Sequence, residues 1–152
     1  MHFISTRNNA PAATLSQAIA AGLAPDGGLY VPQQMPAPRT LQAGASLADT
    51  ASTLLQPFFA GDGLEPELPR ICAEAFDFPA PLRRLATRND HVLELFHGPT
   101  AAFKDFGARF LAASLSRLRA DQARPLTIVV ATSGDTGAAV AAAFHGQPGL
   151  QV

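Results

Sequence analysis

At 152 residues, the chain is long enough for one domain, or for a small domain and part of a larger one. Apolar residues make up 47% and charged residues 15%, which predicts a packed core and argues against intrinsic disorder. The net charge of −1, from eleven basic and twelve acidic side chains, gives no electrostatic reason to expect nucleic acid or an anionic membrane as a partner.

The first part of the chain is predicted to form a short strand, a helix and a second short strand. Residues 3–5 are weakly extended. Thr14 and Gln17 have the spacing of a capping box, in which each side chain accepts a hydrogen bond from the other residue's backbone amide. Gly22 is expected to end this helix. Residues 25–28, Pro-Asp-Gly-Gly, are typical of a turn, and residues 29–31 of a strand.

Two more helices are predicted after a proline-rich connector at residues 32–38. Ser46 is placed to cap the first, whose apolar residues recur at helical spacing: Leu47, Leu54, Leu55 and Phe58. The second is marked by Leu68, Ile71, Cys72 and Ala75. Cys72 is the only cysteine, so no disulfide can form within the chain, and its apolar neighbours favour a buried core residue over a nucleophile. A domain junction is expected near residue 80.

The second half has the pattern of alternating strands and helices. An apolar run at residues 92–96 predicts a buried strand, and a loop at residues 97–100 leads into an aromatic-rich helix. Residues 126–131 predict a strand buried on both faces, and residues 132–137 turn the chain into an alanine-rich helix that ends at Gly146. A further strand begins at residue 150. This alternation predicts a parallel α/β sheet. Because the pattern breaks off inside the sheet, we expect a fragment of a longer protein: a small α+β domain at 1–80 and an incomplete α/β domain at 81–152.

Lys104 is the first candidate for chemistry, because it is the only lysine and the other ten basic residues are arginines. A composition that uses arginine elsewhere suggests that this position needs an amine that can lose its proton. At the junction of a Gly-Pro loop and an aromatic-rich helix, Lys104 is expected to be partly desolvated, which makes its amine more available as a nucleophile. The alternative is an ordinary surface lysine.

The turn at residues 132–137 is the second candidate. A glycine-bearing turn between a strand and a helix directs several backbone amides one way, and the helix N-terminus adds partial positive charge. Ser133, Gly134, Asp135 and Thr136 therefore suit a bound carboxylate or phosphate. Simple helix capping by Ser133 or Asp135 is an equal alternative on this evidence. The segment is neither a Walker loop nor a dinucleotide-binding fingerprint.

The histidines do not predict a metal site. The four, His2, His91, His97 and His145, share no ligand spacing with one another or with the cysteine, so we expect no bound metal. His97 lies in the loop before Lys104, where we expect it to orient the loop through a hydrogen bond. No nucleophile-elbow sequence is present.

Four segments, in order, resemble threonine synthases. His97 to Gly107, His-Gly-Pro-Thr-Ala-Ala-Phe-Lys-Asp-Phe-Gly, is similar to the cofactor-lysine segment of that family, and residues 131–137 are similar to one of its loops. Residues 5–7 and 22–32 resemble its N-terminal domain. The resemblance implies a fold type II enzyme that uses pyridoxal 5'-phosphate to convert O-phospho-L-homoserine and water to L-threonine and phosphate.

The same resemblance implies roles for individual residues. Lys104 holds the cofactor as a Schiff base and later carries protons, and the turn of Ser133, Gly134, Asp135 and Thr136 binds the substrate carboxylate. The family's glycine-rich loop for the cofactor phosphate and its partner of the pyridine nitrogen lie later in the chain than residue 152, so these residues alone are expected to be inactive. A cytoplasmic enzyme is expected, because residues 1–9 lack the apolar run of a signal peptide. Another fold type II lyase, such as a serine or threonine dehydratase, and a non-catalytic truncated relative remain the alternatives.

Overall fold

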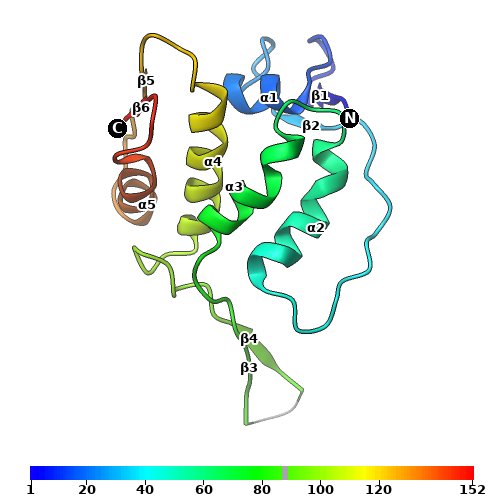
Figure 1. Ribbon diagram of the computed structural model, residues 1–152, viewed down its shortest axis with the longest axis vertical. Helices are drawn as coiled ribbons and strands as arrows, with labels where there is room; N and C mark the ends of the chain where they lie inside the picture. Colours follow the sequence, from blue (N-terminus) through cyan, green and yellow to red (C-terminus); the bar gives the residue numbers. More distant parts are fainter. Residues whose placement is uncertain (87–88) are drawn as a thin grey trace. The chain divides into compact units, whose positions relative to one another are not determined.

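The computed structural model describes residues 1–86 and 89–152, which form two compact units, Met1–Cys72 and Ala73–Val152 (Figure 1). Each has a mixture of helices and short strands, so the predicted α/β class is confirmed. The units divide at residue 72, and the expected domain junction near residue 80 stays a prediction. Within the described residues, no helix is both long and apolar enough to cross a bilayer.

The N-terminal unit begins with a two-stranded antiparallel sheet and a capped helix. Strand β1 (Phe3–Ser5) pairs with β2 (Tyr30–Pro32), and α1 (Leu15–Ala21) lies between them in the chain. The predicted capping box is confirmed: the Gln17 amide donates to Thr14 Oγ1 at 3.2 Å, and the Thr14 amide donates to Gln17 Oε1 at 2.9 Å. Gly22 ends α1 with φ of 71°, a left-handed conformation that glycine adopts without strain.

The rest of this unit is helical. Helix α2 (Leu47–Phe59) is capped by Ser46, whose hydroxyl accepts from the Asp49 amide at 3.1 Å, as predicted. A 3-10 turn, η1 (Glu65–Glu67), leads into α3 (Leu68–Ala75). The side chains of this core are almost fully buried: Phe59, Leu64, Leu68, Ile71 and Cys72. The prediction that Cys72 is a core residue is therefore confirmed.

In the C-terminal unit, the predicted buried strand at 92–96 is wrong. The strand there is β4 (His91–Leu93), which pairs antiparallel with β3 (Leu82–Arg84) as an exposed hairpin. Leu93 is 53% exposed and Phe96 also 53%. The start of the run pairs with the segment just before it instead of entering a parallel sheet, and only Glu94 and Leu95 within the run are half-buried.

The remaining elements follow the predicted strand–helix alternation. Helix α4 (Lys104–Leu118) precedes β5 (Leu126–Thr127), and α5 (Asp135–Phe144) precedes β6 (Leu150–Gln151). Strands β5 and β6 are parallel, with Leu126 opposite Leu150, as expected. Helices α4 and α5 pack side by side, which Figure 1 shows, and both carry small buried side chains: Ala112, Ala113, Ala139 and Ala143.

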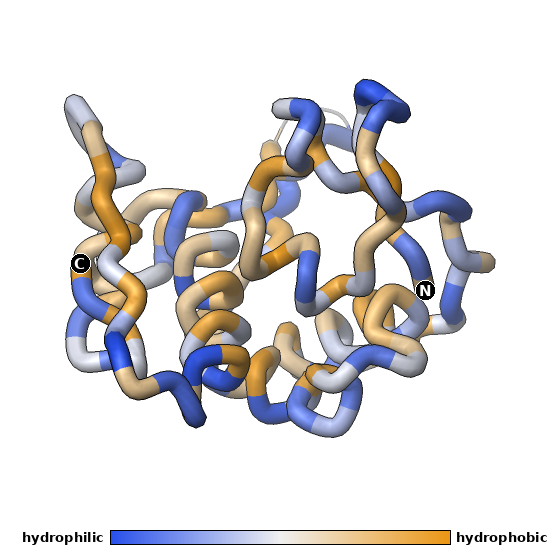
Figure 2. The backbone as a smooth tube through the Cα atoms, turned by 90° about the horizontal axis from the view of Figure 1, so that it is seen from above, coloured by the Kyte–Doolittle hydropathy of each residue, from blue (hydrophilic) through white to orange (hydrophobic). Residues whose placement is uncertain are grey.

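The predicted strand at 126–131, buried on both faces, is only partly present. β5 ends at Thr127, and Val129 is 89% exposed. Figure 2 shows the hydrophobic stretch that follows β5 near the C-terminus. Within residues 1–86 and 89–152, β5 pairs with β6 alone, so the following residues have no second neighbouring strand; Val129 is exposed, whereas Ile128 and Val130 are half-buried. Their apolar character is consistent with a larger sheet than these residues form.

Candidate active site around Lys104

Lys104 is the first residue of α4. Its side chain is half-buried, in agreement with the expected partial desolvation, and Nζ lies 3.7 Å from the centroid of the Phe103 ring. An ammonium over an aromatic face gains about 0.5–1 kcal/mol at a partly exposed site. The Phe103 ring, itself 57% exposed, therefore holds the amine close to the helix start.

The loop before Lys104 is tied to the residue after it. The Thr100 amide donates to Asp105 Oδ2 at 2.9 Å, and the Thr100 hydroxyl donates to Asp105 Oδ1 at 2.7 Å. Asp105 is 1% exposed. Gly98 passes so close to Asp105 that a Cβ at Gly98 would overlap the carboxylate. Ala101 takes a left-handed φ of 55°, which is unfavourable for a residue with a Cβ.

The sequence interpretation missed Asp105. Its position could have indicated a structural role, because Asp105 lies in an aromatic segment directly after the sole lysine. A carboxylate that is buried there needs hydrogen-bond donors. The prediction for His97 is supported, since its Nε2 is 2.7 Å from a Glu94 carboxylate oxygen within the same loop region.

The turn at residues 132–137 is organised by a residue that the sequence interpretation did not single out. The Thr132 hydroxyl accepts from the Gly134 amide at 3.2 Å and from the Gly137 amide at 3.0 Å. Gly137 is buried, and a Cβ there would overlap the Thr132 side chain. Gly134 is the N-cap residue of α5 and has no side chain with which to cap it, and the first-turn amide of Gly137 is bonded by Thr132 instead. The described residues therefore show no capping by Ser133 or Asp135, the alternative left open by the sequence.

The amides of this turn divide into two groups. Those of Gly134 and Gly137 are engaged by Thr132, whereas those of Ser133, Asp135 and Thr136 donate to no protein acceptor in the described part of the chain. Residues 132–136 are exposed. The helix start of α5 thus presents free amides with the partial positive charge of the helix dipole.

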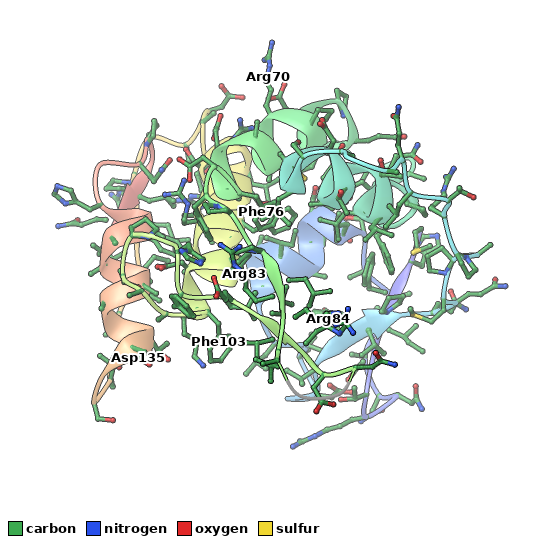
Figure 3. The ribbon with its side chains drawn as sticks, turned by 90° about the horizontal axis from the view of Figure 1, so that it is seen from below. Arg70, Phe76, Arg83, Arg84, Phe103 and Asp135 are labelled. Carbon is green, nitrogen blue, oxygen red and sulfur yellow. The ribbon has the colours of Figure 1, made fainter. Side chains whose placement is uncertain are left out.

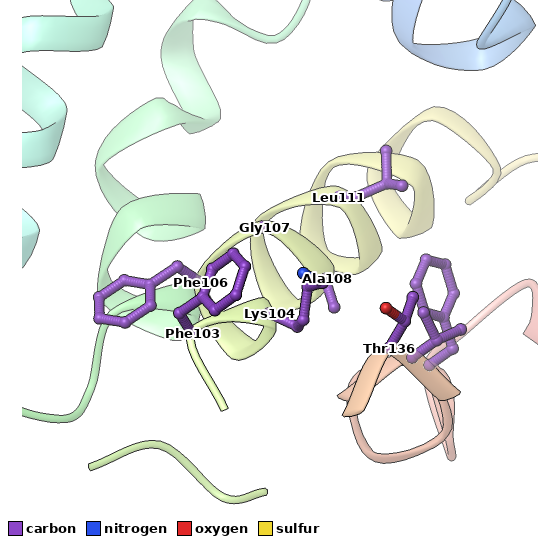
Figure 4. Close-up of a pocket in the computed structure, with 9 residues that line it drawn as sticks. Phe103, Lys104, Phe106, Gly107, Ala108, Leu111 and Thr136 are labelled. Carbon is purple, nitrogen blue, oxygen red and sulfur yellow. The ribbon is translucent and has the colours of Figure 1, made fainter. Parts of the chain in front are cut away.

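Lys104 and the turn meet at a hollow beside α4 and α5 (Figure 4). Its volume is about 500 Å³, and its lining is apolar apart from Lys104 and Thr136: Phe103, Phe106, Gly107, Ala108, Leu111, Val140 and Phe144. A second hollow of about 330 Å³ is lined by residues that include Phe103, Ala101, Ala102 and Asp135. Figure 3 locates Phe103, before α4, and Asp135, at the start of α5.

The predicted site residues are therefore not all in one place. Lys104 and Thr136 share the larger hollow, Asp135 lines the smaller one, and Phe103 borders both. Ser133 and Gly134 line neither of these two hollows and are exposed to solvent.

Helix α4 is held by residues 74–78 of the same unit. Arg109 Nε donates to the Ala75 carbonyl at 3.0 Å, and its guanidinium lies 2.7 Å from an Asp77 carboxylate oxygen. Arg117 pairs with Glu74 at 2.7 Å. The Phe78 ring meets that of Phe106 edge to face, with centroids 4.9 Å apart. These contacts fix the helix whose first residue is Lys104.

Comparisons with known proteins agree with the resemblance seen in the sequence. The family model described as "Threonine synthase N terminus" matches residues 2–76. The chain is 43% identical over 141 residues to a threonine synthase of Haemophilus influenzae, covering 91% of this chain and 32% of that protein. It is 42% identical over 144 residues to the threonine synthase of Escherichia coli, covering 91% and 33%.

Solved structures match the fold over nearly the whole chain. A PLP-bound threonine synthase from Brucella melitensis superposes with a TM-score of 0.87 at 40% identity, covering 99% of this chain and 34% of that one. The yeast threonine synthase gives a TM-score of 0.82 at 30% identity, covering 98% and 34%. The chain spans about a third of the length of the relatives it matches. By sequence and by fold, it belongs to the threonine synthase family and corresponds to the N-terminal third of its members.

Proposed function

We propose that the protein containing this chain converts O-phospho-L-homoserine and water to L-threonine and phosphate, with pyridoxal 5'-phosphate held by Lys104. The observation that carries the proposal is the position of the only lysine: it begins α4 and shares a hollow with Thr136 of the turn at residues 132–137. Membership of the threonine synthase family supports the reaction class, a lyase that depends on pyridoxal phosphate.

The residues around Lys104 fit the lysine end of this cofactor. A volume of about 500 Å³ is in the range of small-molecule sites, and apolar walls suit a flat ring. Lys104 provides the primary amine with which an aldehyde condenses. Among the residues that line the hollow, Lys104 is the only charged one, so the cofactor's phosphate requires donors from elsewhere in the protein.

The chain's own residues would divide the work between proton transfer and substrate binding. Bound pyridoxal phosphate supplies an electron sink that stabilises negative charge on the substrate next to its amine. Lys104 Nζ, the only amine among the residues that line the hollow, would take a proton from substrate Cα and return one. Phe103 and Phe106 line the hollow beside this amine.

The turn at residues 132–137 would hold the substrate carboxylate. The amides of Ser133, Asp135 and Thr136 are free to donate, and the hydroxyls of Ser133 and Thr136 add two more donors. Thr132 and Gly137 fix the turn through their mutual contact. The side chain of Asp135 is negatively charged and would repel a substrate carboxylate, so we assign the binding to the backbone amide of Asp135.

Product analysis on the intact protein tests the proposal. We expect phosphate and threonine from O-phospho-L-homoserine and no ammonia from serine, which would be the product of a dehydratase. Lys104→Ala should abolish turnover, and so should Lys104→Arg, which keeps the charge but offers no amine that can condense with the cofactor. Turnover at the normal rate in either variant, or ammonia release from serine alone, would contradict the proposal.

A further inference from the structure

We propose that Asp105 is a positioning residue that fixes Lys104 by clamping the loop of residues 98–103 onto the start of α4. The inference rests on the proposed function, because it concerns how the cofactor amine is held. Asp105 is the residue next to Lys104, yet it faces the protein interior, at 1% exposure, whereas Lys104 lines the hollow.

Both carboxylate oxygens of Asp105 are used for the clamp. Oδ2 accepts from the Thr100 amide at 2.9 Å and Oδ1 from the Thr100 hydroxyl at 2.7 Å. Hydrogen bonds to an ionised acceptor are about twice as strong as those between neutral groups. A buried carboxylate without such donors would be strongly unfavourable, so the loop and Asp105 hold each other in place.

The loop conformation depends on this clamp. Ala101 has a left-handed φ of 55°, which a residue with a Cβ adopts only when its surroundings impose it. Its amide donates to the Gly98 carbonyl at 3.1 Å, and Gly98 packs so closely against Asp105 that only glycine fits. If the clamp opens, Ala101 is free to relax to negative φ, and the chain then enters α4 along a different path.

The start of helix α4 shows no capping side chain among the described residues. Its N-cap residue, Phe103, makes no side-chain capping bond, and the Asp105 amide bonds back to the Ala102 carbonyl at 3.0 Å. The backbone of Lys104 is therefore positioned by the residues on either side of it, Ala102 and Phe103 before it and Asp105 after it. A shift of about 1 Å in a reacting group costs on the order of a hundredfold in rate, so small movements here are measurable.

Variants of the clamp test the inference through covalent capture of pyridoxal phosphate at Lys104. In the intact protein, the rate of capture is measured by reductive trapping with cyanoborohydride and mass spectrometry of the peptide that contains Lys104. Thr100→Val removes the hydroxyl donor and should slow capture about tenfold, whereas Thr100→Ser keeps the hydroxyl and should capture at the normal rate. Asp105→Ala removes the acceptors of both Thr100 hydrogen bonds and should slow capture by about a hundredfold.

Ser116→Ala is the matched control. Ser116 is also buried on α4 and donates one hydrogen bond, to the Pro148 carbonyl at 2.9 Å, but it lies at the other end of the helix. It should lower the unfolding temperature much as Thr100→Val does and leave the capture rate unchanged. Equal capture rates in Thr100→Val and the unsubstituted protein, or equal slowing in Ser116→Ala, would overturn the positioning role alone. Absence of capture at Lys104 in the unsubstituted protein would instead overturn the proposed function, and the inference with it.

Discussion

Replacing Gly137 by alanine tests how the turn at residues 132–137 is built. A Cβ at this position would overlap the Thr132 side chain, chiefly its methyl carbon Cγ2. The Thr132 side chain would have to rotate, and its hydroxyl would then lose the hydrogen bonds from the Gly134 and Gly137 amides, which are 3.2 and 3.0 Å long. The change therefore acts on the shape of the turn and leaves the proposed donor residues themselves intact.

The expected cost in stability is small. Two hydrogen bonds between neutral groups contribute about 1 kcal/mol each, and less where water replaces them, as it does for the exposed Thr132. Alanine in place of glycine near a helix start returns up to about 1 kcal/mol. The net loss is about 1 kcal/mol or less, well below the roughly 5–15 kcal/mol by which domains are stable. The variant should fold.

The expected cost in substrate binding is larger. A hydrogen bond from a backbone amide to a carboxylate contributes about 1.5–3 kcal/mol, so misplacing one amide of the turn should raise KM for O-phospho-L-homoserine about tenfold or more. Because the carboxylate is held equally before and during the reaction, kcat should change little. The double variant Gly137→Ala/Thr132→Ser removes the methyl group and keeps the hydroxyl, so it should recover most of the binding. Unchanged KM in Gly137→Ala, with unfolding measured in parallel, would refute this account of the turn.

Three further predictions concern the fold around the site. Burial raises the pKa of the Cys72 thiol to about 11. Its thiolate fraction at pH 8 is therefore about a hundredfold below that of a thiol with the ordinary pKa of 9.0. Alkylation of Cys72 should be slow in the native protein and fast in urea. Burial alone would raise the pKa of Asp62, but hydrogen bonds from the Ser16 hydroxyl and from the Leu64 and Ser16 amides outweigh it and hold the pKa below its ordinary 3.8. This stabilisation is complete above pH 3.8 and disappears as the pH falls through the lowered pKa of Asp62. Over that pH range the free energy of unfolding should decrease in the unsubstituted protein and decrease less in Asp62→Asn. Urea titrations at several pH values would measure the difference. Arg109→Met should lower the free energy of unfolding by about 1–3 kcal/mol through the lost bonds to residues 75 and 77, and a thermal midpoint equal to that of the unsubstituted protein would contradict this role.

Local features of the fold could be predicted from the sequence because their causes lie within a few residues. Thr14 and Gln17 satisfy each other's amides across one helical turn, and Ser46 does the same for Asp49. Cys72 belongs to a set of apolar residues that recur at helical spacing, and that spacing was enough to predict that Cys72 lies in the core. Such signals need no knowledge of the rest of the protein.

Burial of the strands could not be predicted in the same way. The apolar runs at 92–96 and 126–131 are typical of buried strands, but burial depends on which segments pair with them and cover them. Val92 pairs with Arg83 in an exposed hairpin, and Val129 lies beyond the end of β5. The composition of these runs suits strands in the interior of a sheet, and such a sheet needs more strands than the described residues form.

The site was predictable only where a residue type is itself informative. Lys104 was singled out as the sole amine, and the turn at residues 132–137 by its glycines and hydroxyls. Asp105 and Thr132 were missed because their roles come from backbone geometry: a loop that folds Thr100 back onto Asp105, and a turn that brings Gly137 against Thr132. Neither contact has a sequence spacing that distinguishes it from ordinary surface residues.

Borohydride reduction of the intact protein with pyridoxal phosphate, followed by peptide mapping, is the sharpest test of whether Lys104 holds the cofactor. We expect one phosphopyridoxyl group, on Lys104, and none in Lys104→Ala treated in parallel. Recovery of the label at another amine, with Lys104 unmodified and the protein fully active, would contradict it.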